Sequence, residues 1–304
     1  MIAFQFPPFA GSSAIQRTLR FVQHLPQHGW EPLVLSAAPA AYESTSDDLL
    51  MAVPAGTVVE RALALDAARH LAIAGRYPSL LARPDRWRTW AIGGGLVGRR
   101  MIERYRPDIL WSTYPIATAH LLGAKLQRAS GLPWVADFRD PMAQDGYPPD
   151  PATWRAFDRI ERAAVQAARF SVFTTPGAAA LYRDRYAALA ARVRVIENGY
   201  DEETFGAVQV DGARVPLATG RLTLLHSGVV YPEERDPRQF IAALALLKAD
   251  GTAAAVPFAV RFRASSQDAL LADLARQHGV AELVELMPAV PYAQALDEML
   301  RADA

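Results

Sequence analysis

Short apolar runs alternate with longer amphipathic stretches along this chain of 304 residues. The short runs are bounded by turn residues, which is typical of buried strands, and the longer stretches place Ala and Leu at helical spacing. Strands that alternate with helices form parallel sheets covered on both faces, so the pattern predicts an α/β protein with doubly wound, Rossmann-like domains. The runs predicted as strands cover residues 1–6, 31–36, 57–63, 108–113, 134–138, 170–174, 193–197, 222–228, 258–263 and 283–287.

The pattern divides the chain into two domains, 1–200 and 221–304. Between them, 201–220 contains Gly and Pro without strong periodicity and is interpreted as a linker. The second domain alternates strands with helices at 237–249, 268–277 and 292–304. A doubly wound sheet uses about six strands. We therefore expect this domain to be incomplete and the native chain to continue past Ala304.

Composition excludes several classes of function. The 32 basic residues equal the 32 acidic ones, so no net field attracts nucleic acid, and the absence of Cys excludes disulfides and thiolate catalysis. His24, His28, His70 and His278 lack metal-ligand spacing, so no metal site is expected. No apolar run approaches the about 20 residues of a membrane span, and no secretory leader opens the chain. We expect a cytoplasmic protein.

Parallel sheets bind ligands where their strands end, and the loop after residues 1–6 carries suitable residues. It holds Gly11, Ser12 and Ser13. Small residues and a serine helix cap let backbone amides approach an anion or a sugar hydroxyl. A tight strand-to-helix turn without a ligand explains the same residues.

A second loop closes the strand at 134–138 with Asp137, Arg139 and Asp140. Charges at the end of a buried strand are costly unless they are paired or used. Asp137 and Arg139 are expected on the same side of the strand, so one acid can pair with Arg139 while another faces the cleft. These three residues are candidate catalytic residues; a structural ion pair that closes the strand is the alternative.

Five motifs in series resemble those of bacterial family 4 glycosyltransferases, and the resemblance covers nearly the whole chain. They are Pro7-Pro8 with Gly11-Ser12, Trp111-Ser112-Thr113-Tyr114-Pro115 with His120, the segment 133–141, Glu197-Asn198-Gly199-Tyr200-Asp201, and His226-Ser227-Gly228 with Arg235-Asp236-Pro237. The resemblance implies a GT-B architecture, with acceptor binding in the N-terminal domain and most nucleotide-sugar contacts in the C-terminal domain. It also implies retention of anomeric configuration without a metal or cofactor.

The resemblance further implies roles for single residues. Donor contacts are expected at Gly11, Ser12, Ser13, His226, Gly228 and Arg235, with Arg235 at the diphosphate. A structural role for His226 is equally common for a His that ends a core strand. Acceptor contacts are expected at Ser112, Tyr114, His120, Trp87 and Trp90. Relatives carry two glutamates separated by seven residues in the C-terminal domain, and this chain has no such pair. We expect truncation rather than divergence to explain this.

Residues 70–106 combine an excess of Arg with Tyr77, Trp87 and Trp90. This chemistry suits an anionic membrane surface or a lipid-diphosphate acceptor and predicts peripheral contact at the inner face of the membrane. A solvated basic helix face is the simpler alternative. Residues 93–98 match a dinucleotide-binding glycine pattern, but no good strand precedes them, so small residues in a closely packed helix are preferred.

The sequence therefore predicts an enzyme that moves a sugar from a nucleotide diphosphate to a glycan or lipid-linked acceptor in envelope polysaccharide assembly. Two alternatives remain open. A non-catalytic glycosyltransferase-like binding module would recognise the acceptor without transfer. A sugar-nucleotide epimerase of the same fold would turn over a nucleotide sugar with no acceptor present.

Overall fold

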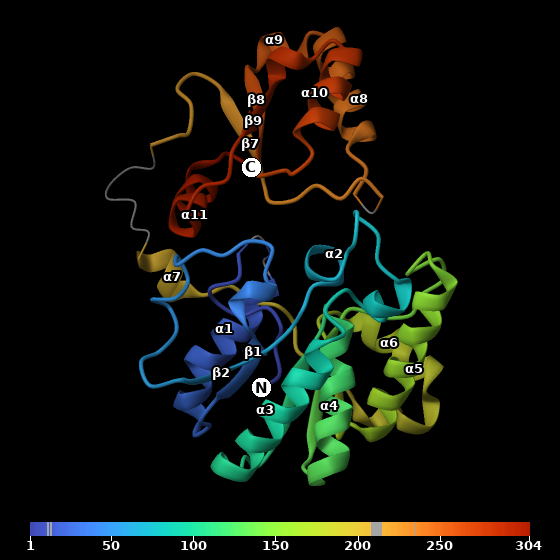
Figure 1. Ribbon diagram of the computed structural model, residues 1–304. Coiled ribbons are helices and arrows are strands. Elements are labelled where there is room, and N and C mark those ends of the chain that lie inside the picture. The colour runs from blue at the N-terminus through green and yellow to red at the C-terminus, as the bar shows by residue number, and fades with distance from the viewer. Residues whose placement is uncertain (11, 13, 208–214, 234) are drawn as a thin grey trace. The chain divides into compact units, whose positions relative to one another are not determined.

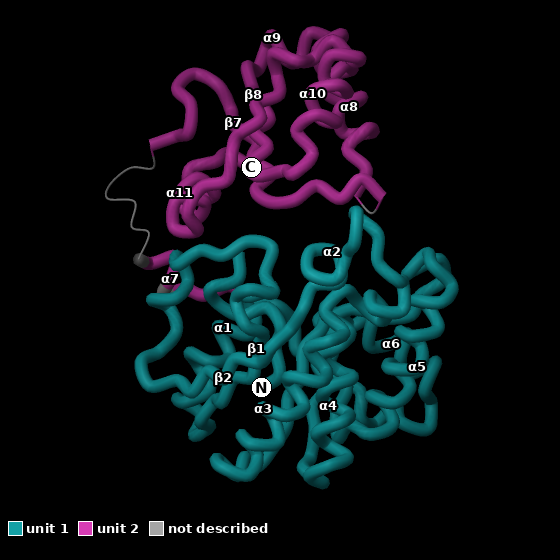
Figure 2. Tube along the Cα trace, viewed as in Figure 1, with its two compact units in different colours: residues 1–199 teal, residues 200–304 magenta. Residues whose placement is uncertain are grey.

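The computed structural model describes residues 1–10, 12, 14–207, 215–233 and 235–304, and these residues form two compact units, Met1–Gly199 and Tyr200–Ala304 (Figure 2). The strands are β1 (Leu33–Ala37), β2 (Val58–Ala62), β3 (Leu110–Thr113), β4 (Trp134–Arg139), β5 (Phe170–Phe173), β6 (Val193–Val195), β7 (Leu222–Ser227), β8 (Phe258–Arg263) and β9 (Val284–Met287). The α-helices are α1 (Ala14–His24), α2 (Ala67–His70), α3 (Trp90–Tyr105), α4 (Ala117–Ser130), α5 (Pro151–Ala167), α6 (Pro176–Arg185), α7 (Glu202–Ala207), α8 (Arg238–Ala249), α9 (Thr252–Ala255), α10 (Asp268–Gln277) and α11 (Tyr292–Arg301). The segment interpreted as a linker contains α7, and its residues 208–214 lie outside the described ranges.

The first unit is built on one parallel sheet. β1 pairs with β2, and β3 to β6 pair in chain order. Ile2 joins the two sets because it forms parallel bridges with Leu35 of β1 and Ser112 of β3. The order is therefore β2, β1, the N-terminal segment, β3, β4, β5 and β6, which reverses direction at the N-terminal segment as a Rossmann-like sheet does.

The strand predicted at 1–6 is reduced to this bridge at Ile2. The reason lies at the carbonyl of Phe4, which accepts hydrogen bonds from the hydroxyls of Ser36 and Tyr42 instead of a neighbouring strand amide. Those side-chain bonds satisfy the backbone without a continued ladder.

Helices cover both faces of this sheet (Figure 1). On one face, Phe21 of α1 packs edge-on against Trp111 with ring centroids 5.6 Å apart. On the other face, α3 and α4 lie side by side. They are so close that a Cβ on Gly94 would come within 2.6 Å of the Leu122 side chain. The glycine pattern at 93–98 therefore belongs to a closely packed helix, as preferred from the sequence.

The second unit has the parallel strand order β7, β8, β9. Val260 and Phe262 of β8 pack with α8 and α10 in a small core. Arg263 of β8 is bound by Glu298 of α11, and both side chains are buried. The helix predicted at 292–304 ends at Arg301, because the backbone of Asp303 and Ala304 bonds to β7 instead: Leu225 donates to the Ala304 carbonyl at 2.8 Å.

Candidate active site

A small cavity lies where the strand order of the first unit reverses. The carboxyl ends of the N-terminal segment and β3 meet there, at the position where open parallel sheets bind ligands. Its volume is about 10 Å³, which is near the room that one water molecule needs. The lining residues are Phe4, Gln5, Ala14, Thr113, Tyr114, Pro115, Ile116 and Arg139.

Two polar atoms of this lining lack a protein partner. Gln5 Oε1 and Arg139 Nε are buried and have no hydrogen bond to any described residue. An unpaired buried donor or acceptor is costly, so such atoms indicate a site that a ligand or water completes. Arg139 Nε–H can donate and Gln5 Oε1 can accept. One hydroxyl group, which both accepts and donates, would satisfy the two atoms together.

Arg139 reaches this cavity because the end of β4 is irregular. The pairing with β5 shifts register between Asp137 and Arg139, and Arg139 has φ 64°. This left-handed conformation is uncommon for Arg and breaks the alternation of side chains along the strand. Arg139 Nη1 donates to the Tyr114 carbonyl at 3.3 Å. Burial lowers the pKa of Arg139, while the charges of Asp137 and Asp140 oppose that shift.

The prediction that an acid of this loop pairs with Arg139 is wrong for Asp137, which pairs with Arg17 instead. That carboxylate is fully buried and is bound by Arg17 of α1, with Nε donating to Oδ2 and Nη2 to Oδ1, both at 3.0 Å. The hydroxyl of Thr113 donates to Oδ2 at 2.9 Å. Because its oxygens are occupied and enclosed, Asp137 holds the strand end in place rather than facing a ligand.

Arg17 is a residue of this strand end that sequence analysis did not identify. Besides Asp137, its guanidinium contacts the end of β6, where it donates to the Ile196 carbonyl at 3.0 Å and to Asn198 Oδ1 at 3.3 Å. The available signal was a single Arg on an amphipathic helix that follows a strand-end loop. That signal is weak, because the partner lies 120 positions away in sequence.

Asp140 is the exposed acid of this strand end. Its amide donates to the Phe138 carbonyl at 2.7 Å, which turns the chain directly after β4. Burial raises the pKa of the Tyr114 phenol well above its usual value, and Tyr147 and the charge of Asp140 raise it further. Asp140 directly follows Arg139, whose side chain lines the switch-point cavity. It is the carboxylate of this loop that a ligand can approach.

Most of the residues expected to contact the acceptor belong to the core of the first unit. Ser112, Trp90 and His120 are completely buried, so their side chains are not available to a bound acceptor in this structure. Trp134 Nε1 donates to Ser112 Oγ, and that hydroxyl lies 2.8 Å from His120 Nδ1, so Ser112 and His120 form a core network. Trp87 is partly buried and packs against the core, with its Nε1 bonded to the Ala41 carbonyl at 3.3 Å. Tyr114 alone of this set lines the switch-point cavity.

The loop before α1 was expected to contact the donor. Ser12 Oγ accepts from the Ala14 amide at 3.1 Å, a local turn directly before α1. Gly11 and Ser13 lie outside the described residues.

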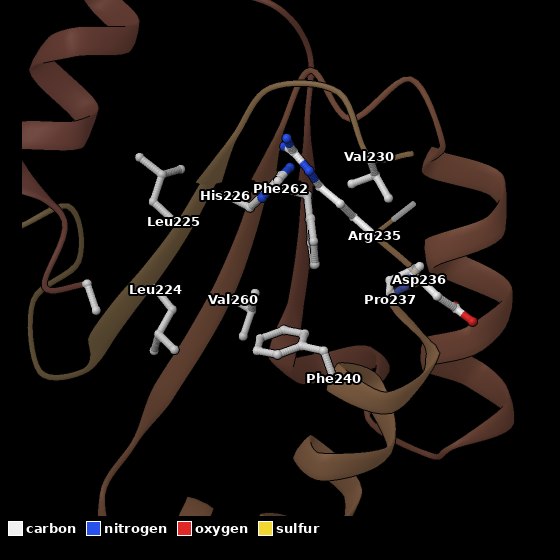
Figure 3. Close-up of a pocket in the computed structure, with 11 residues that line it drawn as sticks. Leu224, Leu225, His226, Val230, Arg235, Asp236, Pro237, Phe240, Val260 and Phe262 are labelled. Atoms are coloured by element: carbon white, nitrogen blue, oxygen red, sulfur yellow. The ribbon is translucent and has the colours of Figure 1, made fainter. Parts of the chain in front are cut away.

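The second unit contains a pocket of about 500 Å³ beside the carboxyl end of β7 (Figure 3). Its walls are mainly apolar and come from β7, β8 and the first turn of α8. His226 and Arg235 supply polar atoms at the end of the pocket that faces the strand termini. The residues that line it are Leu224, Leu225, His226, Val230, Arg235, Asp236, Pro237, Phe240, Val260, Phe262 and Ala304.

Arg235 and His226 are both available for a ligand in this pocket. The Arg235 side chain is exposed, lies over the ring of Tyr231 at 5.8 Å and extends toward the end of β7 that carries His226 (Figure 3). His226 Nε2 is buried and has no hydrogen-bond partner among the described residues. An exposed guanidinium beside an unpaired imidazole nitrogen suits an anionic group that carries hydroxyls.

Gly228, expected to contact the donor, lies directly after β7. Its φ of 131° favours glycine, but its amide donates to the Arg263 carbonyl at 2.9 Å. The amide is therefore used within the sheet, and Gly228 serves to turn the chain away from β7.

Neither tryptophan of residues 70–106 is an exposed side chain. Trp90 is in the core and Trp87 packs on it, which corrects the expectation of interfacial tryptophans in this segment. Exposed apolar side chains nearby are Ile73, Leu80, Ile92 and Leu96.

None of the helices in the described ranges combines the length and apolar character that a membrane span requires. Across the same ranges, no group of three or more His, Cys, Asp or Glu side chains is arranged to hold a metal ion.

Comparison with known proteins connects these features to a family. A family model described as a glycosyl transferase 4-like domain matches residues 14–199, which is more than half of the chain. No curated protein sequence matches this chain.

Solved structures with the same fold include enzymes of more than one kind. Sucrose-phosphate synthase from Thermosynechococcus elongatus aligns with a TM-score of 0.64 and 13% identity, over 99% of this chain and 73% of that one. HepE from Anabaena, solved in complex with UDP-glucose, aligns with a TM-score of 0.59 and 14% identity, over 99% of this chain and 71% of that one. A putative UDP-N-acetylglucosamine 2-epimerase from Listeria monocytogenes aligns with a TM-score of 0.56 and 11% identity, over 99% of this chain and 72% of that one. These likenesses confirm the predicted α/β fold with Rossmann-like domains.

Proposed function

Because the chain belongs to the glycosyl transferase 4-like family, we propose that it transfers a sugar from a nucleotide diphosphate to a glycan or lipid-linked acceptor. The observation that carries this proposal is the family match across the unit that holds the switch-point cavity, with Gln5 Oε1 and Arg139 Nε unpaired in its lining. A hydroxyl that attacks a sugar needs this kind of position, in which its oxygen is held and its proton can leave.

In this proposal the first unit takes the acceptor. An acceptor hydroxyl accepts from Arg139 Nε–H and donates to Gln5 Oε1, and the role of carboxylate is assigned to Asp140, the exposed acid that directly follows Arg139. A carboxylate in that place can accept the hydroxyl proton or offset the positive charge that develops on the sugar.

The second unit takes the donor. The apolar walls around Phe240 and Phe262 suit a flat nucleobase or the face of a sugar, while Arg235 meets the diphosphate. The bond between the anomeric carbon and the diphosphate oxygen breaks with its electron pair on the phosphate, and the acceptor oxygen forms the new bond to that carbon. We propose retention of configuration and charge neutralisation by Arg235 in place of a metal.

We also propose that the reaction serves envelope polysaccharide assembly in the cytoplasm, at the inner face of the membrane. A lipid-linked acceptor would be presented there, and the Arg-rich segment 70–106 supports contact with an anionic surface.

A reaction with and without acceptor tests the proposal. The full chain is incubated with UDP-glucose, chosen as probe because HepE binds it, and nucleoside diphosphate is measured with and without a bacterial membrane lipid extract. A transferase releases UDP only when the extract is present. Formation of another UDP-sugar without extract supports the epimerase alternative. Nucleotide binding without turnover across a panel of UDP-, GDP- and ADP-sugars supports the binding module.

A further inference from the structure

A groove of about 550 Å³ lies on the first unit between the segment 79–88, α4 and α5. Four arginines line it, two from each side of the groove: Arg83, Arg88, Arg155 and Arg159. No Asp or Glu is among its lining residues. Segments far apart in sequence therefore bring four guanidinium groups to one hollow.

The charges of this groove are only partly compensated. Arg83 contacts Asp150 at 3.4 Å, and that carboxylate is about half exposed, with 52% of its side chain accessible. Arg88 Nη1 donates to the Leu80 carbonyl at 2.9 Å, and Arg159 Nε donates to the Arg155 carbonyl at 3.2 Å. Backbone carbonyls orient a guanidinium without neutralising it, so the groove keeps a strong positive charge.

The floor between these arginines is apolar. Leu121, Ala124 and Ile160 contribute to it, and Leu80 on the rim is 62% exposed. His120 also lines the groove, and its Nε2 is buried without a partner in the described part of the chain.

We propose that this groove binds the phosphate headgroup of an anionic membrane lipid, with the first carbons of an acyl chain on the apolar floor. Guanidinium groups pair with phosphate oxygens through two hydrogen bonds, and an apolar floor distinguishes a lipid from a soluble phosphate ester. The groove holds the protein on the membrane and takes no part in sugar transfer. It stands whether or not the proposed transfer reaction is correct.

Vesicle binding tests the proposal with two matched variants of the full chain. Arg155→Gln/Arg159→Gln removes two groove charges, and Arg192→Gln/Arg194→Gln removes two exposed charges at the start of β6, outside both the groove and the segment 70–106. Partition is measured by co-sedimentation with vesicles of phosphatidylcholine, alone or mixed in equal parts with phosphatidylglycerol. Each arginine near an anionic surface contributes about fivefold, so the groove variant should bind the mixed vesicles about 25-fold more weakly. The β6 variant should stay within about twofold of the parent protein.

Equal losses in the two variants, or no loss in either, would overturn the proposal in favour of a diffuse basic surface. Glycerol 3-phosphate serves as the soluble competitor. If it displaces the protein from mixed vesicles at equal phosphate concentration, the groove is a site for soluble phosphate esters and the lipid assignment fails. Unchanged partition in its presence supports the lipid.

Discussion

Arg17 and Asp137 form a two-point ion pair between α1 and β4, with both nitrogen–oxygen distances at 3.0 Å. The side chains are 7% and 0% exposed. The same guanidinium bonds to the carbonyl of Ile196 after β6. The pair therefore fixes the ends of two strands beside the turn that places Arg139 in the switch-point cavity.

Removal of Arg17 should destabilise the first unit. Arg17→Met leaves the Asp137 carboxylate buried without its cation, which costs about 3 to 5 kcal/mol in free energy of unfolding. All six tryptophans lie within residues 1–199, so urea unfolding followed by tryptophan fluorescence reports on this unit. Arg162→Met is the control, because Arg162 pairs with Asp158 on the exposed side of α5 and its loss should leave the midpoint unchanged. Similar midpoints for both variants would contradict the role of Arg17.

The stability of the first unit should decrease as the pH is lowered from 7 to 5, because of His120. Burial lowers the pKa of His120 to about 3, below its ordinary value, so the folded state resists protonation that the unfolded state accepts. The stabilisation is fully present above the unfolded pKa of about 6.5 and is lost as pH falls toward the folded value, by about 2 kcal/mol at pH 5. His120→Asn keeps an acceptor for the Ser112 hydroxyl and removes the titration. The unfolding free energy of this variant should depend less on pH between 7 and 5; an unchanged slope would rule out His120 as the cause.

Nucleotide binding should depend on Arg235. A charge-assisted hydrogen bond to phosphate contributes about 1.5 to 3 kcal/mol, so Arg235→Ala should weaken binding of UDP-glucose and of free UDP by about tenfold to a hundredfold. Titration calorimetry on the full chain measures both. Arg238→Ala is the matched control, because Arg238 pairs with Asp236 and does not line the pocket. If the control weakens binding and Arg235→Ala does not, the diphosphate lies elsewhere in the second unit.

Transfer should depend on the charge of Asp140. Asp140→Asn keeps the shape of the side chain but cannot accept a proton, and loss of a general base typically costs about a hundredfold or more in rate. UDP affinity should not change, since the donor contacts are assigned to the second unit. Asp145→Asn, an exposed acid in the same loop region, should leave the rate unchanged. A loss of UDP affinity in Asp140→Asn would mean that donor and acceptor are assigned to the wrong units.

Periodicity was sufficient to predict most elements of this fold. β8 and α10 have the predicted bounds, because apolar alternation and turn residues mark both ends of each element. Periodicity also located Asp137, Arg139 and Asp140 at a strand end. It could not predict which acid is buried, because the partner of Asp137 is set by the topology that brings α1 to β4.

Local backbone geometry limited the remaining predictions. A strand model with regular alternation places Asp137 and Arg139 on one side, whereas the register shift and the positive φ of Arg139 separate them. Likewise, Trp90 lies in a segment whose sequence is rich in Arg, and its burial follows from the packing of α3 on the sheet.

The most direct test of sugar transfer is the mass of the product. The full chain is incubated with a nucleotide sugar and the lipid extract, and acceptor products and free nucleoside diphosphate are quantified together by mass spectrometry. Sugar transfer should give an acceptor heavier by one sugar residue, with one nucleoside diphosphate released for each product formed, and a large loss of both signals in Asp140→Asn. Nucleoside diphosphate without a glycosylated product, or an isomerised nucleotide sugar in reactions without extract, would contradict it.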